Sequence, residues 1–156
     1  MIRVRLQVDR GVDRAVDRDT RRALVERCHR IARALGIRSG ALELLGLRIV
    51  DDTTMIALHR EHMGTAKPTD VLSFPGEGYG EGDIAIDWDQ LRRQAAVATP
   101  AGLRAEAEQL LLHAMVHLCG HDHGTPSQAR RMRRAETRAA RAAALPRPTR
   151  PYGAGA

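Results

Sequence analysis

Four of the seven histidines in this 156-residue chain fall in one short segment, HAMVHLCGHDH at positions 113–123. His113 and His117 are four residues apart in a pattern that predicts a helix, so their imidazoles lie on one face, one turn apart. Gly120 allows the backbone to turn, and His123 follows six residues after His117. Two nitrogens from a helix and a third from the returning loop are donors that a single zinc ion accepts. We therefore predict that His113, His117 and His123 hold one metal ion.

The spacing of these ligands indicates a catalytic site rather than a closed structural one. Three neutral nitrogens leave the fourth position of a tetrahedral zinc ion open to water. The same His-x3-His-x2-Gly-x2-His spacing is typical of the metzincin peptidases, which need a glutamate directly after the first histidine as general base. Ala114 occupies that position here, which argues against a peptidase. Nickel and other divalent ions that prefer imidazole would fit the same ligands.

Three neighbours of the histidine ligands have roles of their own to explain. His121 lies two residues nearer the helix than His123 and is expected to point outward. Asp122 is either a turn residue or a hydrogen-bond acceptor that fixes the tautomer of a ligating imidazole. Cys119 is an alternative ligand, but a small buried thiol at the helix end is the preferred interpretation.

The rest of the chain predicts a single α+β domain, with a small mixed four-stranded sheet packed by about five helices and the metal site at the end of a helix. Residues 1–145 form the predicted domain, and the Pro- and Gly-rich residues 146–156 a disordered tail. Strands are predicted at 2–8, 42–50, 71–74 and 83–87, and helices near 17–35, 53–63, 88–98 and 101–119 and from 126, after a capping box formed by Thr125 and Gln128.

The charge and the cysteine content limit which partners and which cellular compartment fit the chain. Residues 129–150 hold eight arginines and one acidic residue, which favours a polyanionic partner such as nucleic acid, although a solvated helix face has the same composition. Aromatic residues make up only 3% of the chain, so base-stacking platforms are not expected. Two cysteines cannot form a disulfide framework, and no segment approaches the ~20 apolar residues of a membrane span. We predict a cytoplasmic protein that does not bind a membrane.

Three further motifs accompany the histidine segment: PTDVLSFP at 68–75, GDI at 82–84, and Met132 with Glu136. In this order they resemble the YbeY family of zinc-dependent bacterial endoribonucleases over roughly residues 45–140. The resemblance implies a single-strand-specific endoribonuclease that matures the 3′ end of 16S ribosomal RNA and acts in ribosome quality control. It implies ribosomal RNA and ribosomal or small-subunit proteins as partners, and no DNA. It also places His113, His117 and His123 at the three zinc-ligand positions, with one zinc ion per chain.

The chain departs from the family pattern at several positions. Glycine and tyrosine of the family's histidine motif are Ala114 and His121 here, and the arginine expected to meet phosphate is Met63. A guanidinium at that place would hold two phosphate oxygens. Arg60 or Lys67 are the candidates to replace it, and Asp70 or Asp83 are candidates for proton transfer. Each of these four also fits an ordinary surface or strand-end role.

Other functions remain open from the sequence. The main alternative is a non-catalytic ribosome-assembly factor with a structural zinc, an interpretation that Met63 favours. A metallohydrolase acting on another substrate and a plain basic RNA-binding domain rank below it, because the histidine spacing predicts a metal.

Overall fold

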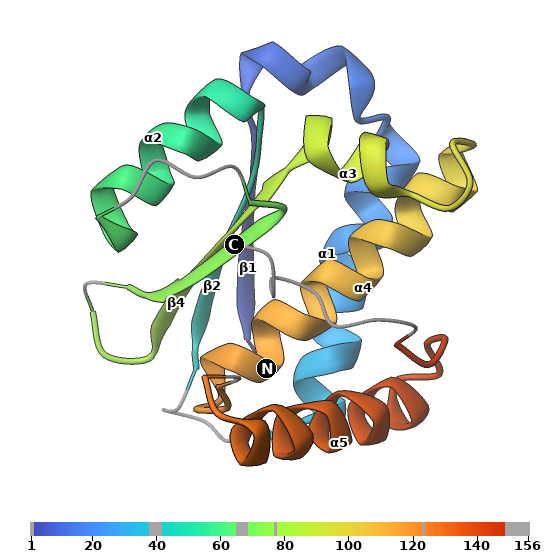
Figure 1. Ribbon diagram of the computed structural model, residues 1–156. Coiled ribbons are helices and arrows are strands. Elements are labelled where there is room, and N and C mark those ends of the chain that lie inside the picture. Colours follow the sequence, from blue (N-terminus) through green and yellow to red (C-terminus); the bar gives the residue numbers. More distant parts are fainter. Residues whose placement is uncertain (1, 38–41, 65–68, 77, 123, 149–156) are drawn as a thin grey trace.

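A mixed four-stranded sheet lies at the centre of the fold (Figure 1). The computed structural model describes residues 2–37, 42–64, 69–76, 78–122 and 124–148. The strands run in the order β1-β2-β4-β3, which leaves β1 and β3 at the edges. The three parallel strands are β1 (Arg3–Val8), β2 (Leu44–Val50) and β4 (Glu81–Asp87), and β3 (Val71–Pro75) is antiparallel to β4. The predicted α+β class and mixed four-stranded sheet are confirmed.

One face of the sheet carries the larger hydrophobic core. Leu45, Leu47 and Ile49 of β2 point to this face and are buried. They are covered by α1 (Arg18–Ala34) and α4 (Pro100–Leu118), as Figure 1 shows. The last helix, α5 (Pro126–Ala142), packs against α1 and α4 and forms an outer layer below them in Figure 1. The C-terminal end of α4 is therefore held between the sheet and α5.

The opposite face of the sheet is only partly covered. The helix α2 (Asp52–Met63) packs over β4 and closes a small second core of Val50, Met55, Leu72 and Ala85. The short helix α3 (Trp88–Gln94) follows β4 directly, and the Trp88 side chain is buried in the larger core. Alternate residues of β1 on this opposite face, Arg3, Arg5 and Gln7, are exposed. The β1 side of the sheet therefore has one face open to solvent.

The predicted elements are present, with differences at their ends. The predicted strand at 42–50 begins at Leu44, and the helix expected near 88–98 ends at Gln94 because Ala95 is extended. A short 3-10 helix, η1 (Arg10–Ala15), was not predicted, since six residues are too few to show a helical period. The capping box of Thr125 and Gln128 is confirmed at the start of α5. In the predicted tail, residues 149–156 lie outside the described residues, so the domain boundary stays a prediction.

Candidate metal centre

The C-terminal half of α4 presents the two helical histidines that the sequence singled out. Residues 109–116 of α4 are buried without interruption, because this segment passes between the sheet and α5. His113 belongs to the buried segment and is 8% exposed, whereas His117, one turn later, is half-buried. The helix therefore runs from the core to the surface across these two residues, which places the His117 end of the pair next to solvent.

A buried carboxylate fixes the orientation of the first histidine. His113 Nδ1 lies 2.7 Å from Oε1 of Glu136 on α5, and both side chains are almost completely buried. A carboxylate only accepts hydrogen bonds, so the proton is on Nδ1, which donates to Glu136. In this tautomer Nε2 carries the lone pair that can bind a metal. Carboxylate, imidazole and metal in series are a common arrangement in zinc proteins.

The turn after α4 is the one that the sequence predicted. Gly120 has a φ of 96°, a left-handed conformation that favours glycine, and its N–H donates to the His117 carbonyl at 3.0 Å. The Nδ1 atom of His117 is buried, although the residue as a whole is partly exposed. For both histidines, Nδ1 faces the protein.

The remaining residues of the histidine segment lie on the loop that leads to α5. His121 is half-buried and Asp122 is exposed. Cys119 is exposed at the helix end, so the expectation of a buried thiol is wrong there. His123 lies outside the described residues, and its part in the metal site stays a prediction.

The four weaker candidates are spread over the fold. Asp83 follows Gly82, where an added Cβ would meet Leu118 of α4 at 3.1 Å, so Asp83 points to the opposite face of the sheet. There its carboxylate fills the space that a side chain at Gly46 would need. Arg60 is exposed on α2, which covers that same opposite face. Lys67 lies outside the described residues.

Asp70 lies at the other end of β4 from the histidines. Its carboxylate accepts a hydrogen bond from Gln94 Nε2 at 3.0 Å, and its carbonyl accepts one from the Asp87 N–H. Gly82, which approaches Leu118 at the end of α4, is five residues before Asp87 along the strand, a span of about 16 Å. The structure therefore does not bring Asp70 next to the histidine pair.

A cluster of three carboxylates at that other end of the sheet was missed by the sequence analysis. Oxygens of Asp52, Asp87 and Asp89 lie within 4.8 Å of one another, close enough to hold a cation. Asp52 follows β2, and Asp87 ends β4, so the carboxyl ends of two neighbouring parallel strands bring them together. Arg93 donates to both oxygens of Asp52, at 2.8 and 2.9 Å, and already offsets part of this charge. Acidic residues directly after two predicted strands were the available signal.

Burial and this crowding of charge separate the acidities of two of these carboxyls. Burial, followed by the hydrogen bond with Asp52, raises the pKa of Asp87 to about 7. The Arg93 guanidinium, followed by the hydrogen bond with Asp87, lowers the pKa of Asp52 to about 2. Below about pH 7 the Asp87 carboxyl therefore keeps its proton, which can be donated to the Asp52 carboxylate. Oδ1 of Asp87 also caps α3 by accepting from the Asp89 and Gln90 N–H groups.

The two candidate sites differ in the metal that their donor atoms suit. Imidazole nitrogens favour zinc and other late transition metals, and carboxylates favour magnesium and calcium. The Glu136 contact leaves His113 in the tautomer that a metal requires. Among the described residues, the histidine pair on α4 therefore fits zinc, and part of the charge of the carboxylate cluster is already neutralised by Arg93.

Comparison with known proteins assigns the chain to a family. The family model described as "Endoribonuclease YbeY" matches residues 8–143, which is most of the chain. The chain belongs to the endoribonuclease YbeY family. An endoribonuclease YbeY from an Anaeromyxobacter species is 38% identical over 133 residues, covering 82% of this chain and 67% of that protein. The endoribonuclease YbeY of Halorhodospira halophila is 37% identical over 114 residues, covering 67% of this chain and 73% of that protein.

The match does not extend over the full length of the relatives. The endoribonuclease YbeY of Cutibacterium acnes is 43% identical over 102 residues, and the match spans 64% of that protein. Among solved structures, the solution structure of a Thermotoga maritima protein matches with a TM-score of 0.50 and 18% identity, covering 97% of this chain and 100% of the other. That likeness supports the fold alone. The chain is thus a member of an endoribonuclease family, and its match spans about two thirds of the length of several curated relatives.

The Asp52–Asp87 pair makes a prediction about pH. The unfolded chain ionises Asp87 near its ordinary pKa of 3.8, whereas the folded protein holds the proton until about pH 7. The folded state binds more protons in this interval, so this group lowers the free energy of unfolding as the pH rises from 4 to 7. Asp87→Asn keeps a side-chain oxygen to cap α3 but has no carboxyl to ionise, so the decline in the free energy of unfolding between pH 4 and 7 should disappear. Relative to the wild type, the variant should gain roughly 2 kcal/mol or more of stability between pH 4 and pH 7. Urea unfolding at several pH values measures it.

The matched variant Asp52→Asn should show the opposite change in the pH dependence of stability. In the wild type the pKa of Asp52 is about 2, so its ionised side chain stabilises the fold above pH 4 and loses this effect as the pH falls toward 2. The variant should be less stable than the wild type above pH 4, and the difference should shrink toward pH 2. A stability profile of Asp87→Asn parallel to that of the wild type between pH 4 and 7 would contradict the shared proton.

Proposed function

We propose that the chain is a zinc-dependent endoribonuclease that cleaves single-stranded RNA, with residues 1–145 as its catalytic domain and 146–156 as a tail. His113, His117 and His123 hold one zinc ion per chain. The observation that carries the proposal is the 2.7 Å contact of His113 with Glu136, which prepares a buried imidazole for metal binding in a chain of the YbeY family. A zinc ion bound there would act as a Lewis acid on a phosphodiester and lower the pKa of water toward ~7.

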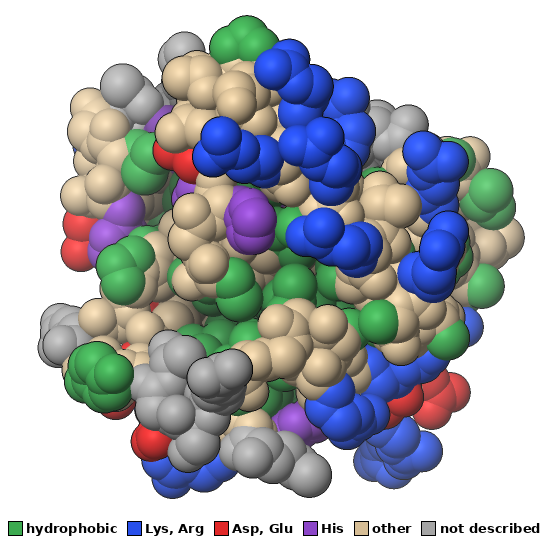
Figure 2. Space-filling model, turned by 90° about the horizontal axis from the view of Figure 1, so that it is seen from below, with side chains coloured by type: hydrophobic (Ala, Val, Ile, Leu, Met, Phe, Trp, Pro, Cys, Tyr) green, Lys and Arg blue, Asp and Glu red, His purple; other side chains and the backbone are tan. Residues whose placement is uncertain are grey.

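An exposed basic helix lies beside this site and is suited to bind the RNA backbone. The buried residues of α5, including Met132 and Glu136, pack inward, and its arginines point outward. Seen from below, where α5 lies in Figure 1, basic side chains gather on one side of the molecule, with a histidine beside them (Figure 2). Among the described residues, no carboxylate forms an ion pair with the exposed arginines of α5, which are Arg130, Arg131, Arg133, Arg134, Arg138 and Arg141.

The cellular role proposed for the chain is narrower than RNA cleavage. It matures the 3′ end of 16S ribosomal RNA in the cytoplasm, takes part in ribosome quality control, and meets ribosomal or small-subunit proteins rather than DNA. The basic surface of α5 and the family membership support an RNA substrate. None of the helices in the described part of the chain is long and apolar enough to cross a membrane.

A second function is favoured by one observation. Met63, at the position where the family resemblance leads us to expect an arginine, is 61% exposed at the end of α2. A thioether cannot neutralise phosphate charge, so a chain that binds zinc and RNA without cleaving it would be an assembly factor with a structural zinc. Zinc content and RNA cleavage measured on the same purified protein separate the two functions.

Replacing His117 by alanine should abolish metal binding and RNA cleavage together. The purified wild type is expected to contain about one zinc per chain, since the ligand set is mononuclear. His117→Ala should lose zinc and cleavage of a ribosomal RNA substrate while keeping its helical circular dichroism. His29→Ala, a histidine change on α1, is the matched control and should behave as the wild type. Zinc in the wild type without cleavage would favour the assembly factor, and unfolding of His117→Ala would show that the metal is structural.

Replacing Glu136 by glutamine should weaken zinc binding without removing a ligand. The side chain keeps its size but loses the charge that strengthens the His113 donor, and such changes cost about 10- to 100-fold in metal affinity. Competition with a fluorescent chelator measures it. The control is Glu108→Gln, a change on the same helix as His113 that weakens the ion pair with Arg27 of α1, and it should leave zinc affinity unchanged. Equal zinc affinity in Glu136→Gln and the wild type would argue against His113 as a ligand.

Neutralising the outer arginines of α5 should reduce the salt dependence of RNA binding. Arg131, Arg134 and Arg138 recur at helical spacing on the exposed side of α5. Their replacement by glutamine should lower the slope of log affinity against log salt by up to about 2 on single-stranded RNA, near 0.7 per phosphate contact. Fluorescence anisotropy of labelled RNA, at salt concentrations from about 50 to about 300 mM, would measure this slope. Arg92→Gln on α3 is the control, and a slope equal to that of the wild type would exclude α5 from the RNA interface.

A further inference from the structure

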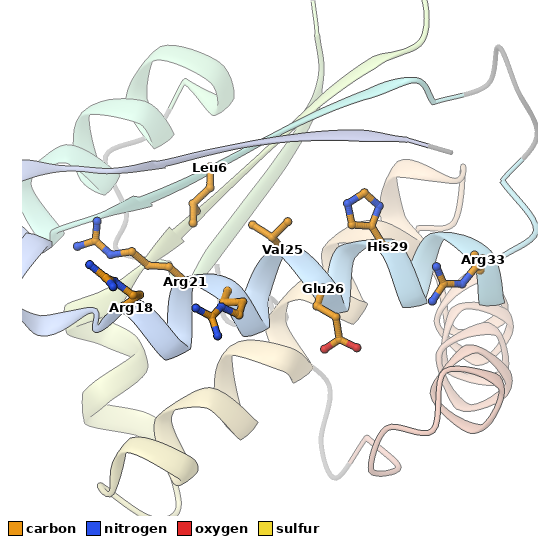
Figure 3. A pocket seen from close by; sticks show the side chains of 8 residues that line it. Leu6, Arg18, Arg21, Val25, Glu26, His29 and Arg33 are labelled. Carbon is orange, nitrogen blue, oxygen red and sulfur yellow. The ribbon is translucent and has the colours of Figure 1, made fainter.

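A surface groove of about 690 Å³ runs between the edge strand β1 and α1. Leu6 of β1 and Val25 of α1 point toward one another across it, as Figure 3 shows. Arg18 and Arg21 lie at one end of the groove and Arg33 at the other (Figure 3). The groove thus has an apolar contact of Leu6 and Val25, with His29 beside it, between basic ends, and it belongs to neither the histidine pair nor α5.

The edge of β1 beside this groove offers backbone groups for another strand. The Arg3 N–H donates to the Glu43 carbonyl and the Asp9 N–H to the Ile49 carbonyl, so odd-numbered residues of β1 face β2. In a parallel ladder the intervening residues turn both backbone groups away from the partner strand. The N–H and C=O groups of Val4, Leu6 and Val8 therefore point outward, and within the described residues no backbone hydrogen bond to them is formed. Such an edge is a template for a further strand.

The charges around the groove select an acidic occupant. Arg18, Arg22 and Arg33 are exposed, and no carboxylate among the described residues pairs with them. The acidic lining residue, Glu26, is already neutralised by Arg27 and Arg30. Arg21 is paired with Asp13. The groove therefore carries three positive charges without a partner.

The open face of the sheet adds to the same charge. Arg3 and Arg5 are exposed on the face of β1 away from α1. A strand added to β1 would have alternate side chains next to Arg3 and Arg5 on one face and above the groove on the other. Basic residues on both sides of the edge also disfavour a second copy of this chain pairing through β1, because like charges would meet.

The length and the donors of the surface fit a peptide. From Arg18 to Arg33, α1 extends about 22 Å, the span of six or seven extended residues, which is also the length of β1. RNA phosphates would satisfy the arginines but offer no donors to the outward carbonyls of Val4 and Leu6. An extended peptide offers donors and acceptors alternately and an apolar side chain for the contact with Leu6 and Val25. The observations favour a protein partner over RNA at this surface.

We propose that the outward edge of β1 and the groove beside α1 bind an acidic, extended segment of a partner protein as a fifth strand of the sheet. Acidic side chains of the segment meet Arg18, Arg22 and Arg33 around the groove and Arg3 and Arg5 on the open face. An apolar side chain between them packs on Leu6 and Val25.

The test uses the full chain and a terminally blocked eight-residue peptide of glutamates with a single valine near its middle, so that acidic side chains lie on both faces of the added strand and the apolar one can face Leu6 and Val25. Amide exchange followed by NMR should show the Val4, Leu6 and Val8 N–H groups protected at least about tenfold by saturating peptide, while those of Arg3 and Arg5, already bonded to β2, change little. A peptide with lysine in place of glutamate should not bind. Protection elsewhere, or equal binding of the lysine peptide, would overturn the proposal.

Variants separate this surface from the RNA-binding one. Arg18→Glu combined with Arg22→Glu should weaken binding of the acidic peptide about tenfold or more, as expected for reversing two surface contacts. Arg92→Glu and the α5 glutamine variants should bind the peptide as the wild type does. RNA binding and cleavage by Arg18→Glu/Arg22→Glu should be unchanged. An equal loss of RNA affinity would make the groove an RNA surface, and protection of Val4 and Leu6 that grows with protein concentration alone would make it a self-association surface.

Discussion

The buried pair of His113 and Glu136 is the contact on which the arrangement of the candidate site depends. Glu136 is a carboxylate on a helix that is otherwise packed by Met132 and alanines, and a buried carboxylate without a partner is costly. The pair therefore fixes the position of α5 along α4 as well as the tautomer of His113. Because the outer arginines belong to the same helix, their position relative to the histidines is set by the same contact.

The two ends of β4 carry different chemistry. Near Gly82 the strand approaches the end of α4, where the donors are imidazole nitrogens. At Asp87 it reaches the carboxylates that follow the parallel strands, held by a shared proton and by Arg93. Imidazole nitrogens suit late transition metals and carboxylate oxygens suit magnesium or calcium, so the two ends of the strand offer donor sets for different cations. The acidic cluster also joins the start of α2 to α3.

Much of the fold and part of the site could be predicted from the sequence, for local reasons. Helical spacing placed His113 and His117 on one face, and the capping box at Thr125 marked where α5 begins, because both patterns depend on neighbours within a few residues. Glu136 was visible as part of a family motif, but its contact with His113, 23 residues earlier, depends on how α5 crosses α4. The Asp52–Asp87 contact likewise requires the strand order, which places β2 beside β4. Patterns of neighbouring residues contain neither the crossing of two helices nor the order of the strands in a sheet.

The strand order also constrains how this chain reaches its native state. β3 and β4 are antiparallel and close in sequence, so their pairing closes a short loop. Pairing of β1 with β2 closes a longer loop, which contains the whole of α1. Loop closure over longer separations slows folding, and the central pairing of β2 with β4 spans the whole of α2 and β3 as well. During synthesis the first strand to emerge therefore has no partner until Val50 has left the ribosome. The N-terminal strand is bonded to β2 alone, so its release by local unfolding would leave the pairings of β2, β4 and β3 intact.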